Sequence, residues 1–146
     1  MANRVSVASL AIGVALTLTL SSTRAAAQVQ PVEGLKWADA GIPGVSTAVV
    51  QGDMAKGASH FYLRYPAGFV SPLHHHSPDH YATTVSGNLS LTIAGKETRL
   101  PPGSYFSFTG KGPHVARCAG PEACVMFIDA RGAWDVVAEP KPPAKP

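Results

Sequence analysis

The chain of 146 residues has few charged side chains, since Asp, Glu, Lys and Arg make up only 14% of it. It also contains no basic run with interleaved aromatic residues, which is a common pattern of nucleic-acid-binding surfaces. The formal net charge is +3, but Arg4 and Arg24 lie in a leader-like segment, and without them ten basic residues face nine acidic ones. The composition therefore predicts no nucleic-acid partner.

The sequence also lacks an amphipathic stretch with 3.6-residue periodicity long enough for a substantial helix. Instead, short segments rich in β-branched and aromatic residues are bounded by Gly, Pro or Asn. Leu89, Leu91 and Ile93 alternate with polar residues, which is typical of a strand with one buried face. The predicted strands are 47–51, 59–65, 81–86, 89–93, 96–100, 105–108, 114–117 and 124–130. Many short antiparallel strands predict an all-β sandwich or barrel.

Residues 1–27 have the pattern of a signal peptide. Arg4 supplies a positive start, residues 5–20 are mostly apolar, and residues 25–27 are the small alanines that signal peptidase requires. The apolar stretch is short for a membrane span of about 20 residues, and no charged stop follows it. An uncleaved membrane anchor is the alternative. We predict cleavage, a secreted or periplasmic location, and no membrane association of the mature chain.

The remaining chain is predicted to form one domain, at 28–138, followed by a disordered tail at 139–146 that is rich in Pro and Lys. Only two cysteines occur, and Cys118 and Cys124 flank the turn-forming pair Gly120-Pro121. In an exported protein a disulfide between them is the favoured state. The alternatives are a thiolate metal ligand or two unpaired thiols.

Histidine is scarce, with six residues in the chain, yet four of them follow a spacing that predicts one metal site: His74, His76, His80 and His114. Alternation along a strand places His74 and His76 on one face and His75 on the other. A turn at residues 77–79 allows His80 to point toward the same place, and His114 comes from a distant strand. A rigid sheet would fix these ligands before metal binds.

The segment Gly68-x5-His74-x-His76-x3-His80-x6-Gly87 resembles the first cupin motif, G-x5-H-x-H-x3,4-E-x6-G, with every spacing kept. The second cupin motif, G-x5-P-x-G-x2-H-x3-N, aligns with the segment that begins at Gly103. Only Gly103 and His114 match it, because Thr109, Lys111 and Cys118 replace its Pro, Gly and Asn.

This resemblance implies a cupin-type jelly-roll β-barrel, commonly dimeric, with one metal in its mouth. His80 stands where the family usually has a glutamate ligand. The glutamate that serves as a base in some cupin dioxygenases is therefore missing, which leaves direct activation of oxygen, peroxide or water at the metal.

Four neutral imidazoles would leave a divalent metal its full +2 charge. The intrinsic affinity order for such ligands places copper first, and iron, manganese and zinc rank behind it. A closed four-histidine zinc site that only stabilises the barrel is the alternative, since zinc is satisfied by four ligands.

His60, Tyr62 and Tyr105 are candidates for the lining of a substrate pocket, although a surface or core position is the ordinary place for such residues. Asp79 is a candidate partner for the second N–H of a ligand imidazole, or else a turn-forming residue. His75 is expected to face solvent beside the ligands.

Three functions follow. The first is a secreted oxidoreductase that uses O2 or H2O2 as co-substrate to oxidise an extracellular substrate such as a polysaccharide, an oligosaccharide or a plant phenolic. The second is a non-redox zinc or manganese cupin that acts as an isomerase, cyclase or lyase. The third is a non-catalytic cupin that binds a metal or ligand. A homodimer is expected in each case.

Overall fold

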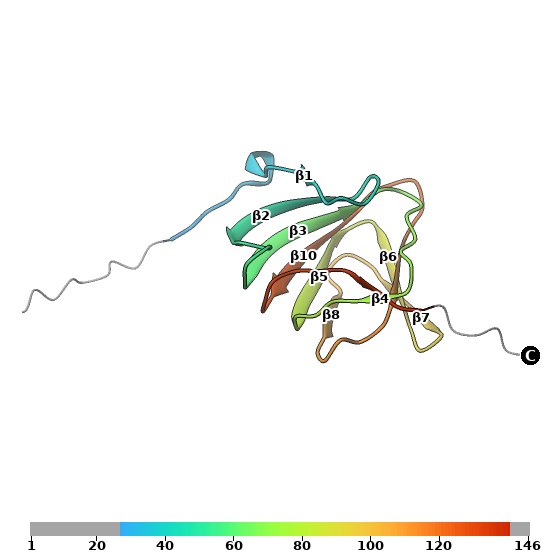
Figure 1. The fold of residues 1–146 in the computed structure, drawn as a ribbon. Coiled ribbons are helices and arrows are strands. Elements are labelled where there is room, and N and C mark those ends of the chain that lie inside the picture. The colour runs from blue at the N-terminus through green and yellow to red at the C-terminus, as the bar shows by residue number, and fades with distance from the viewer. Residues whose placement is uncertain (1–26, 141–146) are drawn as a thin grey trace, which may run out of the picture.

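The computed structural model describes residues 27–140, and in that range the chain is built almost entirely of β-strands (Figure 1). One short 3₁₀ helix, η1 (Val32–Gly34), precedes the strands. The strands are β1 (Ala38–Asp39), β2 (Ser46–Gly52), β3 (Ser59–Tyr65), β4 (His74–His75), β5 (His80–Ser86), β6 (Asn88–Ile93), β7 (Lys96–Leu100), β8 (Tyr105–Phe108), β9 (Val115–Ala119), β10 (Cys124–Ala130) and β11 (Val137–Ala138). Within residues 27–140, no helix has the length and apolar character needed to cross a membrane.

The strands pair antiparallel in three sheets. The largest has the order β1-β2-β3-β10-β5-β8, and a second has the order β7-β6-β9. A two-stranded sheet joins β11 to β4. In Figure 1, β2, β3, β10, β5 and β8 lie side by side, and β6 and β7 lie across from them. This is the jelly-roll barrel that the sequence predicts.

Side-chain alternation places the core between the two larger sheets. Along β3, Phe61, Leu63 and Tyr65 are buried and the residues between them are partly exposed. From the three-stranded sheet, Leu89 and Leu91 reach the same core. β3 and β10 therefore each have a buried, mostly apolar inner face and a partly exposed outer face, as a half-buried strand requires.

The predicted strands are all present, and four of them, β3, β7, β8 and β10, have the predicted bounds. The turn between β6 and β7 is Ala94-Gly95, where both residues have a positive φ, 50° and 81°. This conformation matches the right-handed twist of a two-residue hairpin. The short strands β1, β4 and β11 were not predicted. Most of the predicted signal peptide, residues 1–26, lies outside the described residues.

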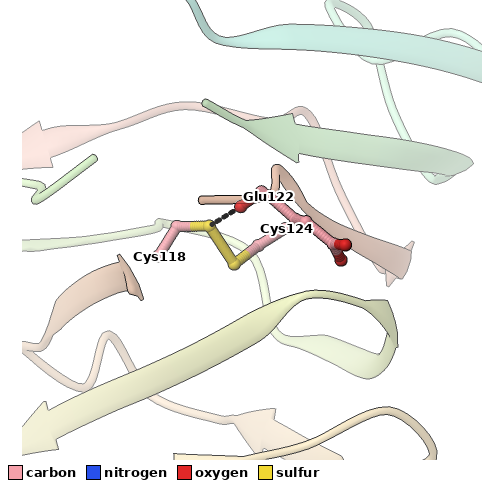
Figure 2. Close-up of a disulfide and its surroundings, with 3 residues drawn as sticks. All are labelled: Cys118, Glu122 and Cys124. Carbon is pink, nitrogen blue, oxygen red and sulfur yellow. Dashed lines mark hydrogen bonds between the residues drawn. A yellow bond between two sulfur atoms is a disulfide. The ribbon is translucent and has the colours of Figure 1, made fainter. Parts of the chain in front are cut away.

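Cys118 and Cys124 form a disulfide, as predicted, and it closes the loop between β9 and β10 (Figure 2). Both cysteines are fully buried, and the Cys118 Sγ lies 3.4 Å from the carbonyl oxygen of Glu122. Gly87, at the end of β5, packs against this bond, because an added Cβ there would lie 2.9 Å from the Cys124 Sγ. The disulfide thus joins the two larger sheets at one end of the barrel.

Candidate metal centre

Three histidines form a compact group inside the barrel. His74 begins β4, His76 follows that strand, and His114 directly precedes β9. The main chains of His74 and His114 exchange two hydrogen bonds of 3.0 and 2.8 Å, which bring the two remote segments together. Each of the three side chains offers a ring nitrogen, and these nitrogens lie within 4.8 Å of one another. Such convergence of imidazoles fits a metal site.

His80 lies beside this group but is not part of it. It begins β5, and its ring centroid lies 4.9 Å from that of His76. It is as deeply buried as the other three, because the four side chains are only 2–6% exposed. The structure therefore shows three candidate ligands, and His80 as a fourth ligand stays a prediction.

The Nδ1 atoms of all four histidines are hydrogen-bonded to main-chain carbonyl oxygens. A carbonyl only accepts, so each Nδ1 carries the proton and Nε2 remains free as the ligand atom. In three cases the carbonyl belongs to the residue two positions earlier: His74 bonds Pro72 at 2.9 Å, His80 bonds Pro78 at 3.3 Å and His114 bonds Gly112 at 3.0 Å. His76 instead donates to the carbonyl of Asp135, 59 residues away. Such outer contacts fix the tautomer and orientation of metal ligands.

Burial keeps these imidazoles neutral. Removal from water lowers the pKa of His76 to about 3 and that of His114 to about 4. The same burial lowers the pKa values of His74 and His80. At neutral pH all four rings therefore offer lone pairs rather than positive charges, and this is the state that a metal ion binds.

Two aromatic side chains form walls of the site. Trp134 stacks on His76 with ring centroids 3.9 Å apart, and Phe108 stacks on His114 at 4.0 Å. His80 contacts both walls, at 5.0 Å from Trp134 and 5.2 Å from Phe108. These rings fix the orientation of the imidazole planes and shield the histidines from water.

Trp134 belongs to residues 131–139, which we call the C-terminal strap. The Trp134 main-chain N–H donates to the Met54 carbonyl at 2.7 Å, and the Asp135 carboxylate accepts from the Ser77 N–H at 2.7 Å. The end of the strap, β11, pairs with β4 directly beside His74. The strap thus packs over the histidines and supplies an acceptor to one of them.

The strap ends at Glu139, the first residue of the predicted tail. Its carboxylate pairs with the Nδ1 of His75 at 2.5 Å, and its N–H donates to the Leu73 carbonyl at 2.9 Å. His75 therefore points away from the metal site, as alternation predicts, but its side chain is only 14% exposed, because it contacts Glu139.

The predicted substrate-lining residues do not meet the histidines. His60 and Tyr62 lie on the outer face of β3, since Phe61 between them faces the core. They border a shallow cleft of about 220 Å³ together with Gln28 and Phe127. Tyr105 is 63% exposed on β8. The structure therefore assigns these three residues to outer surfaces and not to the lining of the metal centre.

Asp79 also has another role than a contact to a ligand imidazole. Its carboxylate accepts from the Gly110 N–H at 2.9 Å, and its carbonyl accepts from the Arg131 N–H at 2.9 Å. Asp79 thus ties the loop before His114 and the start of the strap to the turn before His80. The Nδ1–H groups of the four buried histidines donate to main-chain carbonyl oxygens instead of to the predicted carboxylate of Asp79.

The strap residues were missed because residues 131–136 show neither strand nor helix periodicity. The available signal was Trp134 itself, one of two tryptophans in the chain, placed after the last predicted strand. An isolated large aromatic residue between Ala133 and Asp135 is an unusual choice for a solvated linker.

Comparison with known proteins agrees with this fold. Residues 61–129 match the family model described as Cupin domain. No curated protein sequence matches the chain significantly. The polyketide cyclase RemF from Streptomyces resistomycificus is a similar solved structure, with a TM-score of 0.66 and 14% identity over 81% of this chain and 89% of that one.

Two further structures share the fold. An RmlC-like cupin from Shewanella frigidimarina has a TM-score of 0.58 and 15% identity, covering 73% of this chain and 92% of that one. A recombinant oxalate oxidase has a TM-score of 0.55 and 15% identity, covering 70% of this chain and 59% of that one. The family match and the shared jelly roll identify the described part of this chain as a single domain of the cupin superfamily.

Proposed function

We propose that this chain is an exported cupin oxidoreductase with one metal ion, copper before iron, manganese or zinc. His74, His76 and His114 would hold the metal through Nε2, with His80 as the fourth ligand. The observation that carries the proposal is the ligand set itself, which consists of neutral imidazoles and contains no carboxylate. Imidazole ligands suit copper, which stands highest in the affinity order of the first-row divalent ions.

The residues of this chain prepare that site in two ways. The carbonyls of Pro72, Gly112 and Asp135 fix the tautomers, so the ligand nitrogens need no rearrangement when the ion binds. Trp134 and Phe108 exclude water from the imidazoles. The bound metal would supply redox chemistry with O2 or H2O2 as co-substrate.

The proposed substrate is extracellular, such as a glycan or a plant phenolic. The disulfide supports an oxidising compartment, since such bonds persist in secreted and periplasmic proteins. The signal-peptide pattern of residues 1–27 points the same way. A homodimer remains part of this proposal.

A second candidate is a non-redox metal site. It is either an open zinc or manganese site that acts as an isomerase, cyclase or lyase, or a closed four-histidine zinc site that serves only stability or binding. The burial of the four histidines, at 2–6% exposure, favours the closed form, because zinc with four protein ligands has no open position. The similar structures named above include a cyclase as well as an oxidase, so the shared fold supports either chemistry.

Turnover with oxygen separates the two candidates. The copper-loaded protein is mixed with oligosaccharides and phenolics, and oxygen or peroxide consumption is followed beside product formation. We expect consumption coupled to product, lost in His76→Ala and retained in His60→Ala, whose histidine lies on the outer face. Equal turnover under anaerobic, peroxide-free conditions would contradict the redox proposal and support the second candidate.

A further inference from the structure

A second cleft lies on the opposite side of the three-stranded sheet from the core. Its volume is about 570 Å³, more than twice that of the cleft beside His60. Three charged side chains line it, Glu97, Arg99 and Arg117. His114 directly precedes β9, and Arg117 lies on that strand and faces outward, whereas Ala116 and Cys118 face the core.

Strand register places the two arginines on either side of one serine. Ser90 is directly opposite Arg99 on β7 and directly opposite Arg117 on β9. The two main chains are therefore separated by two strand spacings, about 10 Å. Side chains as long as arginine reach across that gap, so both guanidinium groups can contact one small anion between them.

Ser90 forms the floor of the cleft. Its neighbours Leu89 and Leu91 face the core, so Ser90 faces outward, yet it is only 4% exposed. The surrounding side chains cover it, and its Oγ donates to the Glu97 carboxylate at 2.6 Å. The floor is thus a deep polar surface rather than an open strand face.

Among residues 27–140, neither Arg99 nor Arg117 forms an ion pair, whereas Arg131 and Lys56 each do. With Glu97 included, the cleft carries a formal charge of +1. A single bound carboxylate would neutralise it and accept from both guanidinium groups.

Glu97 and Asn88 add selectivity for hydroxyl groups. Ser90 occupies one oxygen of the Glu97 carboxylate, which leaves the other to accept from a ligand hydroxyl. Asn88 lines the same cleft, and Gly120 leaves it room, since an added Cβ there would lie 3.1 Å from the Asn88 Nδ2. A simple anion would use only the arginines, whereas a hydroxylated acid would use all four side chains.

The disulfide supports one wall of this cleft. Cys118 directly follows Arg117 and is bonded to Cys124 (Figure 2). The lining residues Ala119 and Gly120 lie between the two cysteines, in the loop that this disulfide closes. The covalent bond limits the motion of that wall when the cleft is empty. Such preorganisation reduces the entropy cost of binding.

From these contacts we propose a second ligand site that takes a small hydroxylated carboxylate, of the kind found in a sugar acid. It lies on the outer face of the sheet and is independent of the metal centre. The ligand carboxylate binds between Arg99 and Arg117, and its hydroxyl groups bond to Glu97 and Asn88.

Titration of the full mature protein with D-glucuronate, followed by calorimetry at constant ionic strength, tests the proposal. We expect saturable binding, and a loss of about tenfold or more in affinity for Arg99→Gln and for Arg117→Gln, because each removes a charge-assisted contact. Lys96→Gln is the matched control, since it removes the same charge from β7 without lining the cleft, and it should bind as the wild type does.

Two further probes separate the parts of the ligand. Neutral D-glucose should not bind measurably, and acetate should bind more weakly than D-glucuronate. Removal of the metal should leave D-glucuronate binding unchanged. The proposal is overturned if D-glucuronate does not bind, if the arginine variants bind like Lys96→Gln, or if acetate binds as tightly as D-glucuronate.

Discussion

The two ends of this barrel are held by different kinds of interaction. At the histidine end, β5 begins with His80 and β9 follows His114, and the strap contacts His76 and His80 through Trp134 and accepts a hydrogen bond from His76. At the disulfide end, Cys118 and Cys124 fix the loop between β9 and β10 covalently. We expect the histidine end to respond to protonation and to metal loading, and the disulfide end to respond to redox conditions. Each end should therefore respond to its own perturbation and leave the other unchanged.

The largest expected effect is the loss of metal at the histidine end. His76→Ala removes the imidazole that contacts both His74 and His80. We expect metal affinity to fall by at least about 100-fold, since loss of an outer contact alone costs about 10–100-fold. Metal content after dialysis against a weak chelator measures this, with His60→Ala as the control. Stoichiometric metal in His76→Ala would contradict the assignment.

The strap should contribute most to the stability of the same end. Trp134→Ala removes the ring that stacks on His76 and packs edge-on against Phe61 at 5.1 Å. We expect the free energy of unfolding of the metal-free protein to fall by about 3 kcal/mol, the low end for truncation of a packed aromatic residue. Urea unfolding measures the change, and Trp134→Phe should recover part of it. A wild-type unfolding curve for Trp134→Ala would mean that the strap does not hold the histidine end.

At the disulfide end, we expect a smaller loss of stability and no loss of metal. Replacement of both Cys118 and Cys124 by serine opens a short loop, which in the chain-entropy treatment costs about 2 kcal/mol. The same dialysis experiment should still find wild-type metal content. A fall in metal content would show that the two ends are coupled, against the comparison drawn above.

Acid should weaken the histidine end gradually. The unfolded chain binds protons at its histidines near the ordinary pKa of 6.5, whereas burial lowers the folded pKa of His114 to about 4 and of His76 to about 3. The unfolded state therefore binds more protons in this window, so the free energy of unfolding falls as the pH falls below about 6.5. Each such histidine contributes about 1.4 kcal/mol per pH unit within it.

Urea unfolding of the metal-free protein between pH 7 and pH 4 checks this slope. His76→Gln, which keeps a polar side chain without a proton to gain, should show a smaller slope than the wild type. An equal slope in both proteins would place the titrating groups elsewhere.

The sequence predicted the fold well because alternation and turn chemistry act locally. Residues 59–65 and 124–130 carry their strand pattern within seven residues, and the Ala94-Gly95 turn is equally local. The grouping of His74, His76 and His114 was also predictable from their spacing. The tautomers were not, since they depend on carbonyls such as that of Asp135, which is 59 residues from His76.

Alternation along a strand shows which residues share a face, but it does not show which of the two faces points toward the core. His60 and Tyr62 share a face of β3, but only the structure shows that Phe61 occupies the inner face. The strap was missed for a similar reason, because Trp134 is placed by contacts with distant residues rather than by a local pattern.

The central claim is that the histidine end holds a redox-active metal ion. The most direct measurement is the metal content of the protein as purified from its native cells, recorded with its electron paramagnetic resonance spectrum before and after ascorbate. The account predicts stoichiometric copper and an axial signal with several nitrogen couplings that disappears on reduction. Stoichiometric zinc and a silent spectrum would contradict it.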